Sequence, residues 1–343
     1  MNHKLKHCLI SSSRLMSIIK IIYVLINKNK YIKEVQRRKQ LTLFDYKELS
    51  NVLPYCPSDI VIDNNLYGIT YWLKRYAGIS TTYNLDAYIE HGIFFGSLVR
   101  TDQKIWNVSN IITFSIIRKK HLLSNDINKR VITIGPYIHY AEPILESTTF
   151  KRLKQKLGKV LLVFPSHSII GVDSVFDQDL FIQKIEEVKK DFDTVIVSLY
   201  WVDAQNEDIV NKYKKNNYLI TTAGHRFDIN FLSRLKTIIE LSDFTMSNSV
   251  GTHIGYCIYL KKPHFVYEQN INNIGKNNKL QKHFDAVRNE EELCSEQIEK
   301  SEILLCFNKI INHITSEQYK IIDKYWGVGQ IKSPKELMDI LLK

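Results

Sequence analysis

Residues 219–268 have the sequence LITTAGHRFDINFLSRLKTIIELSDFTMSNSVGTHIGYCIYLKKPHFVYE, and this stretch indicates the fold class of the chain. Short apolar runs alternate in it with segments whose apolar residues recur three and four positions apart, as on one face of a helix. The expected elements are strands over 219–222, 244–246 and 264–268, and helices after Asn230 and over 253–260. Strand–turn–helix–strand units of this kind belong to parallel α/β domains, where ligands bind beyond the carboxyl ends of the strands.

The turn between the second of these strands and its helix is rich in small and hydroxyl-bearing residues. It contains Ser247, Ser249, Gly251 and Thr252. Backbone N–H groups and the helix dipole at such a turn can hold a phosphate group. One N-cap needs only one of these residues, so four of them favour anion binding, with simple capping as the alternative. The turn therefore predicts a nucleotide-sugar site.

The rest of the chain extends the same alternation of strands and helices. At 343 residues the chain is long enough for two domains of about 150 residues each. Further strands are expected over 59–62, 111–115, 131–135, 159–165 and 194–201. We therefore expect an α/β protein with two doubly wound Rossmann-like domains facing across a cleft. The expected parts are an N-terminal segment over 1–40, a first domain over 41–150, a second domain over 151–310, and C-terminal helices over 311–343 that pack back on the first domain.

Composition excludes several classes of protein. The hydrophobic fraction of 44% and charged fraction of 24% are those of an ordinary globular protein. Five cysteines without metal-type spacing favour a reduced cytoplasm over a disulfide framework. The net charge of +11 is concentrated in residues 1–40, which hold ten basic residues and one acidic residue. Because the remainder carries only +2, a nucleic-acid partner is not expected.

The basic N-terminal segment also contains the apolar run 15–26, which Lys20 interrupts. A run of 12 residues is too short to span a bilayer, and no small-residue cleavage site follows it. A basic amphipathic helix can instead lie on an anionic membrane surface. The alternative is an ordinary first helix with a solvated basic end.

Glu90-His91-Gly92 is the candidate catalytic motif in the first domain. A carboxylate beside an apolar strand can act as a general base, and an imidazole, which titrates near neutrality, is the rival for this role. Gly92 would let a substrate approach the backbone closely. The alternative is a turn with a solvated glutamate.

Other polar residues follow strands of the second domain. Gly224, His225 and Arg226 come after the strand at 219–222 and could bind a phosphate or a base edge. Ser166 and His167 follow the strand at 159–165 and could line the cleft. His253 and Glu268 are weaker candidates, and Glu268 could accept a hydrogen bond from a ribose hydroxyl.

No metal or cofactor site is expected from the sequence. Two Asp-x-Asp tripeptides occur, at 177–179 and 191–193. The first opens a predicted helix and the second precedes a strand, so we interpret both as structural. The chain has no Walker loop, no GxGxxG motif and no Cys/His cluster.

Together these clusters resemble the two-domain GT-B glycosyltransferases of bacterial surface polysaccharide biosynthesis, and most of all the sialyltransferase and Kdo-transferase type. Glu90 and Gly92 match the family's acidic base motif, and His225 matches its nucleotide-binding histidine. Ser247 and Ser249 match its phosphate-binding cluster. His91 stands where the family usually has an acid, and Arg226 where it has a proline.

The resemblance implies a metal-independent, inverting transfer that uses no cofactor. The donor would be a nucleotide sugar such as CMP-sialic acid or a related nonulosonate, with UDP-sugars still open. The acceptor, on the first-domain side, would be a glycan or a lipid-linked glycan of O-antigen, lipopolysaccharide or capsule biosynthesis. The protein would act in the cytoplasm or on the inner face of the cytoplasmic membrane. The alternatives are a sugar-nucleotide epimerase of the same fold and a non-catalytic, nucleotide-binding envelope protein.

Overall fold

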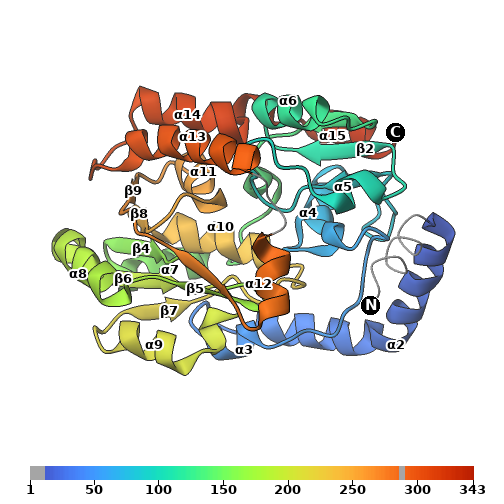
Figure 1. The fold of residues 1–343 in the computed structure, drawn as a ribbon. Helices are drawn as coiled ribbons and strands as arrows, with labels where there is room; N and C mark the ends of the chain where they lie inside the picture. The colour runs from blue at the N-terminus through green and yellow to red at the C-terminus, as the bar shows by residue number, and fades with distance from the viewer. Residues whose placement is uncertain (1–11, 286–289) are drawn as a thin grey trace.

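The computed structural model describes residues 12–285 and 290–343, and its core is built on two parallel β-sheets (Figure 1). The larger sheet has five strands in the order β7-β6-β4-β8-β9, and every neighbouring pair in it is parallel. Its strands are β4 (Val160–Phe164), β6 (Thr194–Ser198), β7 (Leu219–Thr221), β8 (Phe244–Ser247) and β9 (His264–Val266). The chain runs outward from β4 to β7 and then returns to β8 beside β4, which is the doubly wound arrangement.

Both faces of the larger sheet are buried, as expected from its continuous apolar strands. Leu161 and Val163 of β4 share a hydrophobic cluster with residues of helices α8 (Gln178–Val188) and α9 (Glu207–Lys214). The alternate residues Leu162 and Phe164 belong to a second cluster with α10 (Phe231–Leu241) and α11 (Thr252–Tyr259). Because successive side chains of a strand point to opposite faces, these two helix pairs cover the two sides of the sheet.

The smaller sheet has three parallel strands in the order β1-β2-β3. They are β1 (Ala87–Ile89), β2 (Asn110–Thr113) and β3 (Arg130–Thr133). Ile111 and Val131 pack with Leu122 of helix α6 on one face, while Ile89 and Ile112 belong to the cluster shared with the larger sheet. Helices α4 (Ile69–Tyr76), α5 (Thr101–Ile105) and α6 (Ile116–Ser124) lie around this sheet. Helix α3 (Tyr46–Ser50) instead contacts the turn at Asp203–Gln205, and α7 (Ser147–Leu157) leads into β4.

A two-stranded antiparallel ribbon lies outside both sheets and was not expected. It pairs β5 (Val172–Val175) with β10 (Asn272–Gly275). The Asn-rich composition of β10 gave no strand signal, because asparagine is depleted in strands. Five 3-10 turns complete the connections: η1 (Asp63–Asn65), η2 (Tyr137–Tyr140), η3 (Lys189–Asp191), η4 (Asp203–Gln205) and η5 (Val328–Gln330).

The C-terminal helices cross from the larger sheet to the smaller one. They are α12 (Asn278–Asp285), α13 (Glu290–Phe307), α14 (Ser316–Trp326) and α15 (Pro334–Leu341). Helix α14 contacts both α11 and α6, and α15 contacts α4 (Figure 1). The Glu299 carboxylate accepts a hydrogen bond from Gly96 N at 2.7 Å and lies 2.7 Å from His121 Nε2.

The N-terminal helix α2 (Ser13–Lys39) makes hydrogen bonds to both halves of the molecule. Lys20 Nζ donates to Ser58 O at 2.8 Å beside the smaller sheet. Near the other end of α2, the Tyr31 hydroxyl donates to Phe227 O at 3.1 Å, and the buried Arg38 donates to Leu49 O at 2.9 Å. Residues 1–11, which include Cys8 and the first part of the basic segment, lie outside the described residues.

The fold-class prediction is therefore confirmed: the chain has two Rossmann-like α/β halves. The strand expected over 59–62 is wrong. Asp59 Oδ1 accepts a hydrogen bond from Val61 N at 3.1 Å, and the Asp59 carboxylate pairs with the buried Lys74 at 3.4 Å. These local contacts turn the chain into η1 instead of extending it.

Candidate functional site

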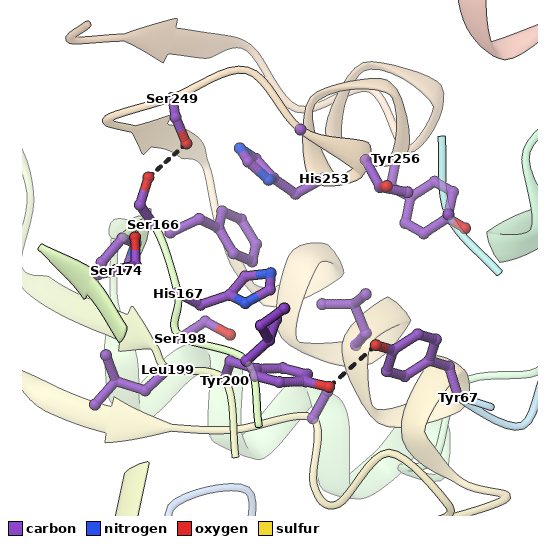
Figure 2. A pocket seen from close by; sticks show the side chains of 18 of the residues that line it. Tyr67, Ser166, His167, Ser174, Ser198, Leu199, Tyr200, Ser249, His253 and Tyr256 are labelled. Atoms are coloured by element: carbon purple, nitrogen blue, oxygen red, sulfur yellow. Dashed lines mark hydrogen bonds between the residues drawn. The ribbon is translucent and has the colours of Figure 1, made fainter. Parts of the chain in front are cut away.

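A cavity of about 600 Å³ lies where the carboxyl ends of strands from both sheets meet. His91 and Gly92 follow β1, Ser166 and His167 follow β4, and Ser249 follows β8. Figure 2 shows a hydrogen-bonded serine pair and a hydrogen-bonded tyrosine pair at opposite ends of this cavity, with His167 and His253 between them. Of the described residues that line it, three are histidines, one is Lys300 and none carries a carboxylate. Such a lining suits an anionic ligand.

The end of the cavity beside β8 has the features of a phosphate site. Gly251 is the N-cap of α11, and Thr252 opens the helix, so the positive end of the helix dipole faces this corner. Ser249 Oγ lies 2.7 Å from Ser166 Oγ, which joins the loops after β8 and β4. The sequence analysis placed Ser249, Gly251 and Thr252 in one turn, and in the structure all three line the cavity.

His253 supplies a polar atom to the same corner. Its ring stacks on Phe164 with centroids 5.0 Å apart, and its Nε2 is buried without a hydrogen-bond partner among the described residues. Burial, followed by the nearby His167, lowers the pKa of His253 to about 3. The imidazole is therefore neutral near pH 7, and one N–H is available to a ligand oxygen.

Ser247 supports this corner from behind and does not line the cavity. It is fully buried, and its hydroxyl donates to Ser249 O at 2.9 Å and lies 3.0 Å from His264 Nε2. These contacts fix the backbone of the turn that carries Ser249.

The Glu90 carboxylate is buried and accepts hydrogen bonds from three side chains. Its carboxylate accepts hydrogen bonds from Arg118 Nε and Nη2 at 3.0 and 2.6 Å, from Thr113 Oγ1 at 2.6 Å and from the Gln103 amide. The Glu90 side chain is 0% exposed, that of Arg118 is 3% exposed, and Glu90 does not line the cavity. With its oxygens already occupied by these donors and no contact with the cavity, the Glu90 carboxylate has a structural role.

His91 lines the cavity, and a carboxylate lies behind its ring. Its Nδ1 is 3.6 Å from Asp63 Oδ2, and its side chain is 23% exposed. Asp63 also accepts hydrogen bonds from Arg100 Nη1 at 3.3 Å and from the Tyr88 hydroxyl. Burial alone would raise the pKa of Asp63, but His91, Arg100 and Tyr88 outweigh burial and lower it below its usual value. Asp63 is therefore ionised at neutral pH, and its charge lies near the His91 Nδ1, which makes no hydrogen bond among the described residues.

The segment 224–226 serves as a joint between the two halves. His225 N donates to Leu49 O at 3.0 Å, and the His225 ring packs against Trp201 with centroids 4.5 Å apart. Burial, followed by the charges of Arg226 and Arg38, lowers the pKa of His225 to about 4. Gly224, His225 and Arg226 do not line the cavity.

Glu268 lies beyond β9, exposed and away from the cavity. The Asp-x-Asp tripeptides lie outside the cavity too: Asp177 caps α8 by accepting from Leu180 N at 2.9 Å, and Asp193 accepts from Lys159 N at 2.7 Å. Within 12–285 and 290–343, no group of three or more His, Cys, Asp or Glu side chains could hold a metal ion. In the same part of the chain, no helix is long and apolar enough to cross a membrane.

Sequence reasoning did not single out Asp63, Tyr67, Tyr200 or Lys300. Tyr67, Tyr200 and Lys300 line the cavity, and Asp63 stands behind His91. Tyr200 was detectable in principle, because it lies at the carboxyl end of the strand expected over 194–201, just after β6 ends at Ser198. The other three reach the site through contacts between distant parts of the chain, and no local pattern marks them.

The fold and the cavity together define an α/β protein with two Rossmann-like halves and a candidate site between them. The sequence matches no protein-family model and no curated protein.

Three solved structures are similar to part of this chain. One is the UDP-GlcNAc 2-epimerase of Methanocaldococcus jannaschii in complex with UDP-GlcNAc and UDP, at 15% identity and a TM-score of 0.38 over 68% of this chain and 61% of that chain. The second is the wall teichoic acid polymerase TagF, at 12% identity and a TM-score of 0.41 over 77% of this chain and 68% of that one. The third is Medicago truncatula UGT71G1 complexed with UDP-glucose, at 12% identity and a TM-score of 0.30 over 69% of this chain and 55% of that chain. Values this low do not assign an activity, so function rests on the geometry of the site.

Proposed function

We propose that this protein is an inverting, metal-independent glycosyltransferase that uses a nucleotide-sugar donor. The observation that carries the proposal is the placement of His91, backed by Asp63, in the same cavity as the N-terminus of α11. His91 can accept a proton from an attacking hydroxyl, and the N-terminus of α11 can stabilise a departing phosphate. An inverting transfer needs these two functions on opposite sides of the anomeric carbon.

The donor's phosphate would bind at Ser249, Gly251, Thr252 and His253, where N–H and O–H groups converge. The described residues of the lining include no carboxylate, which avoids repulsion of this anion. CMP-sialic acid, a related nonulosonate and UDP-sugars are the donor candidates, all of which carry phosphate next to the anomeric carbon.

In the proposed reaction the acceptor oxygen attacks the anomeric carbon while its proton passes to His91. The bond between the anomeric carbon and the phosphate oxygen breaks, and the nucleotide leaves as an anion toward α11. Asp63 keeps the imidazole oriented and stabilises it once it is protonated. Glu90 holds the loop after β1 through its pair with Arg118. We therefore assign the base to His91.

We further propose that the acceptor is a lipid-linked or surface glycan of O-antigen, lipopolysaccharide or capsule biosynthesis, met at the inner face of the cytoplasmic membrane. The support is the exposed apolar face of α2, where Ile18 is 54%, Ile21 56%, Leu25 78% and Ile26 67% exposed. Basic residues flank this face at both ends, among them Arg14 and Lys28. Apolar insertion combined with attraction to anionic lipid is the usual physics of interfacial helices.

The test is a panel of CMP- and UDP-sugars, with nucleotide release and thermal stabilisation measured for the wild type and for His91→Ala. A glycosyltransferase releases nucleotide, faster with acceptor, and His91→Ala keeps donor binding but loses release. An epimerase would convert the donor into an isomer without any acceptor, and a binding protein would be stabilised without turnover. Either of these two results would refute the proposal.

A further inference from the structure

Tyr67 occupies an unusual backbone position at the edge of the cavity. Its φ is +59°, and the next residue, Gly68, has a φ of +68°. A bulky side chain at such a φ is an outlier that persists only where its surroundings impose it. A Cβ on Gly68 would clash with Ile229 O, so at this position the chain packs against the larger half too closely for any side chain.

Hydrogen bonds to the larger half impose this conformation. Tyr67 N donates to Arg226 O at 2.6 Å, and Leu232 N donates to Tyr67 O at 3.2 Å. Trp72 Nε1 donates to Ile229 O at 3.0 Å one turn later. The backbone of Tyr67 is thus fixed by the loop that follows β7, and its side chain is directed into the cavity.

The side chain lies between the candidate base and the opposite wall. The Tyr67 ring centroid is 6.0 Å from that of His91 and 4.7 Å from that of Phe231. Its hydroxyl lies 3.0 Å from the hydroxyl of Tyr200, as the dashed line in Figure 2 shows. Burial, followed by Tyr200, raises the pKa of Tyr67 well above its usual value, so the hydroxyl stays protonated.

We propose that Tyr67 positions the acceptor, donating its hydroxyl hydrogen to the acceptor oxygen that His91 deprotonates. On acceptor binding, the bond from Tyr67 to Tyr200 is exchanged for one to the substrate. The inference rests on the proposed glycosyl transfer and adds a residue to its acceptor side. A strained backbone at this point is consistent with a side chain whose exact placement matters for positioning. The competing explanation is that the tyrosine pair only joins the two halves.

The tyrosine pair offers a matched control, because Tyr67→Phe and Tyr200→Phe each break the same hydrogen bond. Only Tyr67→Phe removes a hydroxyl from the ring that packs beside His91. The donor panel above would be combined with p-nitrophenyl glycosides as acceptor probes. Three quantities would be measured: the donor Kd, the rate of donor hydrolysis by water and the acceptor kcat/KM.

We expect Tyr67→Phe to lower the acceptor kcat/KM by about tenfold, the value of one lost hydrogen bond, with donor Kd and hydrolysis unchanged. Tyr200→Phe should lower the acceptor kcat/KM by less than about threefold. Equal losses in both variants would overturn the inference and leave a structural bridge, and a tenfold weaker donor Kd in Tyr67→Phe would overturn it in favour of donor binding. A wild type that releases no nucleotide from any donor refutes the proposed function itself, and the inference falls with it.

Discussion

Two substitutions at adjacent positions, Glu90→Gln and His91→Ala, should separate stability from catalysis. Glu90→Gln leaves Arg118 buried, 3% exposed, without its counter-charge. Removing one partner of a buried ion pair costs about 3–5 kcal/mol. At about 2–4 °C per kcal/mol for domains of this size, the melting temperature should fall by about 6–20 °C.

His91→Ala should show the opposite pattern. The side chain is partly exposed, and Asp63 keeps its hydrogen bonds from Arg100 and Tyr88. Stability should change by about 1 kcal/mol or less, as for most substitutions outside a core. Loss of a general base lowers turnover by about 10²–10⁴, with little effect on donor affinity.

The assay is nucleotide release from the active donor, at a temperature below the melting point of both variants, normalised to the folded fraction from circular dichroism. Glu90→Gln should turn over within about threefold of the wild type. The reasoning is refuted if Glu90→Gln melts like the wild type yet loses 10² or more in turnover, because Glu90 would then be the base. If both variants turn over normally, the loop after β1 is not catalytic.

Three further predictions concern other parts of the molecule. Ser249→Ala should raise the donor Kd by about 10- to 150-fold, the value of one hydrogen bond to a charged group, and unchanged titration calorimetry would place the phosphate elsewhere. His225, neutral when folded with a pKa of about 4, binds fewer protons than the unfolded chain between pH 6.5 and 4, so stability falls as the pH drops through that window. In urea unfolding, the stability lost between pH 7 and pH 5 should shrink by roughly 2 kcal/mol in His225→Gln, and an unchanged loss would contradict this assignment. Leu25→Ser, at a side chain 78% exposed, should weaken binding to anionic vesicles, whereas Leu305→Ser, at one 75% exposed on α13, should not; equal effects would exclude α2 as the membrane-facing surface.

The larger sheet was predictable because its strands are continuous apolar runs with helices of regular spacing between them. All five of its strands, together with α8, α10 and α11, lie within a few residues of the expected positions. The strand expected over 59–62 failed because Asp59 accepts a hydrogen bond from Val61 N and pairs with Lys74, which no apolar pattern reveals. The ribbon of β5 and β10 was not predicted, because its pairing joins residues about 100 positions apart in the sequence.

The candidate site was predictable to the extent that it follows the ends of parallel strands. Ser166, His167 and Ser249 were found in this way, and all three line the cavity. His91 lines it too, but the sequence marked it only as part of Glu90-His91-Gly92, and the strand β1 before it was not expected. Which side chain each site residue hydrogen-bonds to was not predictable, because that depends on the distances between elements in the folded chain. Glu90 meets Arg118 from 28 positions away, and a motif alone cannot distinguish a structural carboxylate from a base.

The contacts of the C-terminal helices constrain how the chain folds during synthesis. Trp326, fully buried, packs against Phe95 of the first half with ring centroids 5.8 Å apart and donates to Thr252 O of the second half at 3.0 Å. A nascent chain that has completed both sheets still lacks this side chain and the last two helices. The newly made first half therefore stays partly uncovered until α14 (Ser316–Trp326) has left the ribosome. Truncation by even 20 residues should thus yield an aggregation-prone protein rather than a shorter stable one.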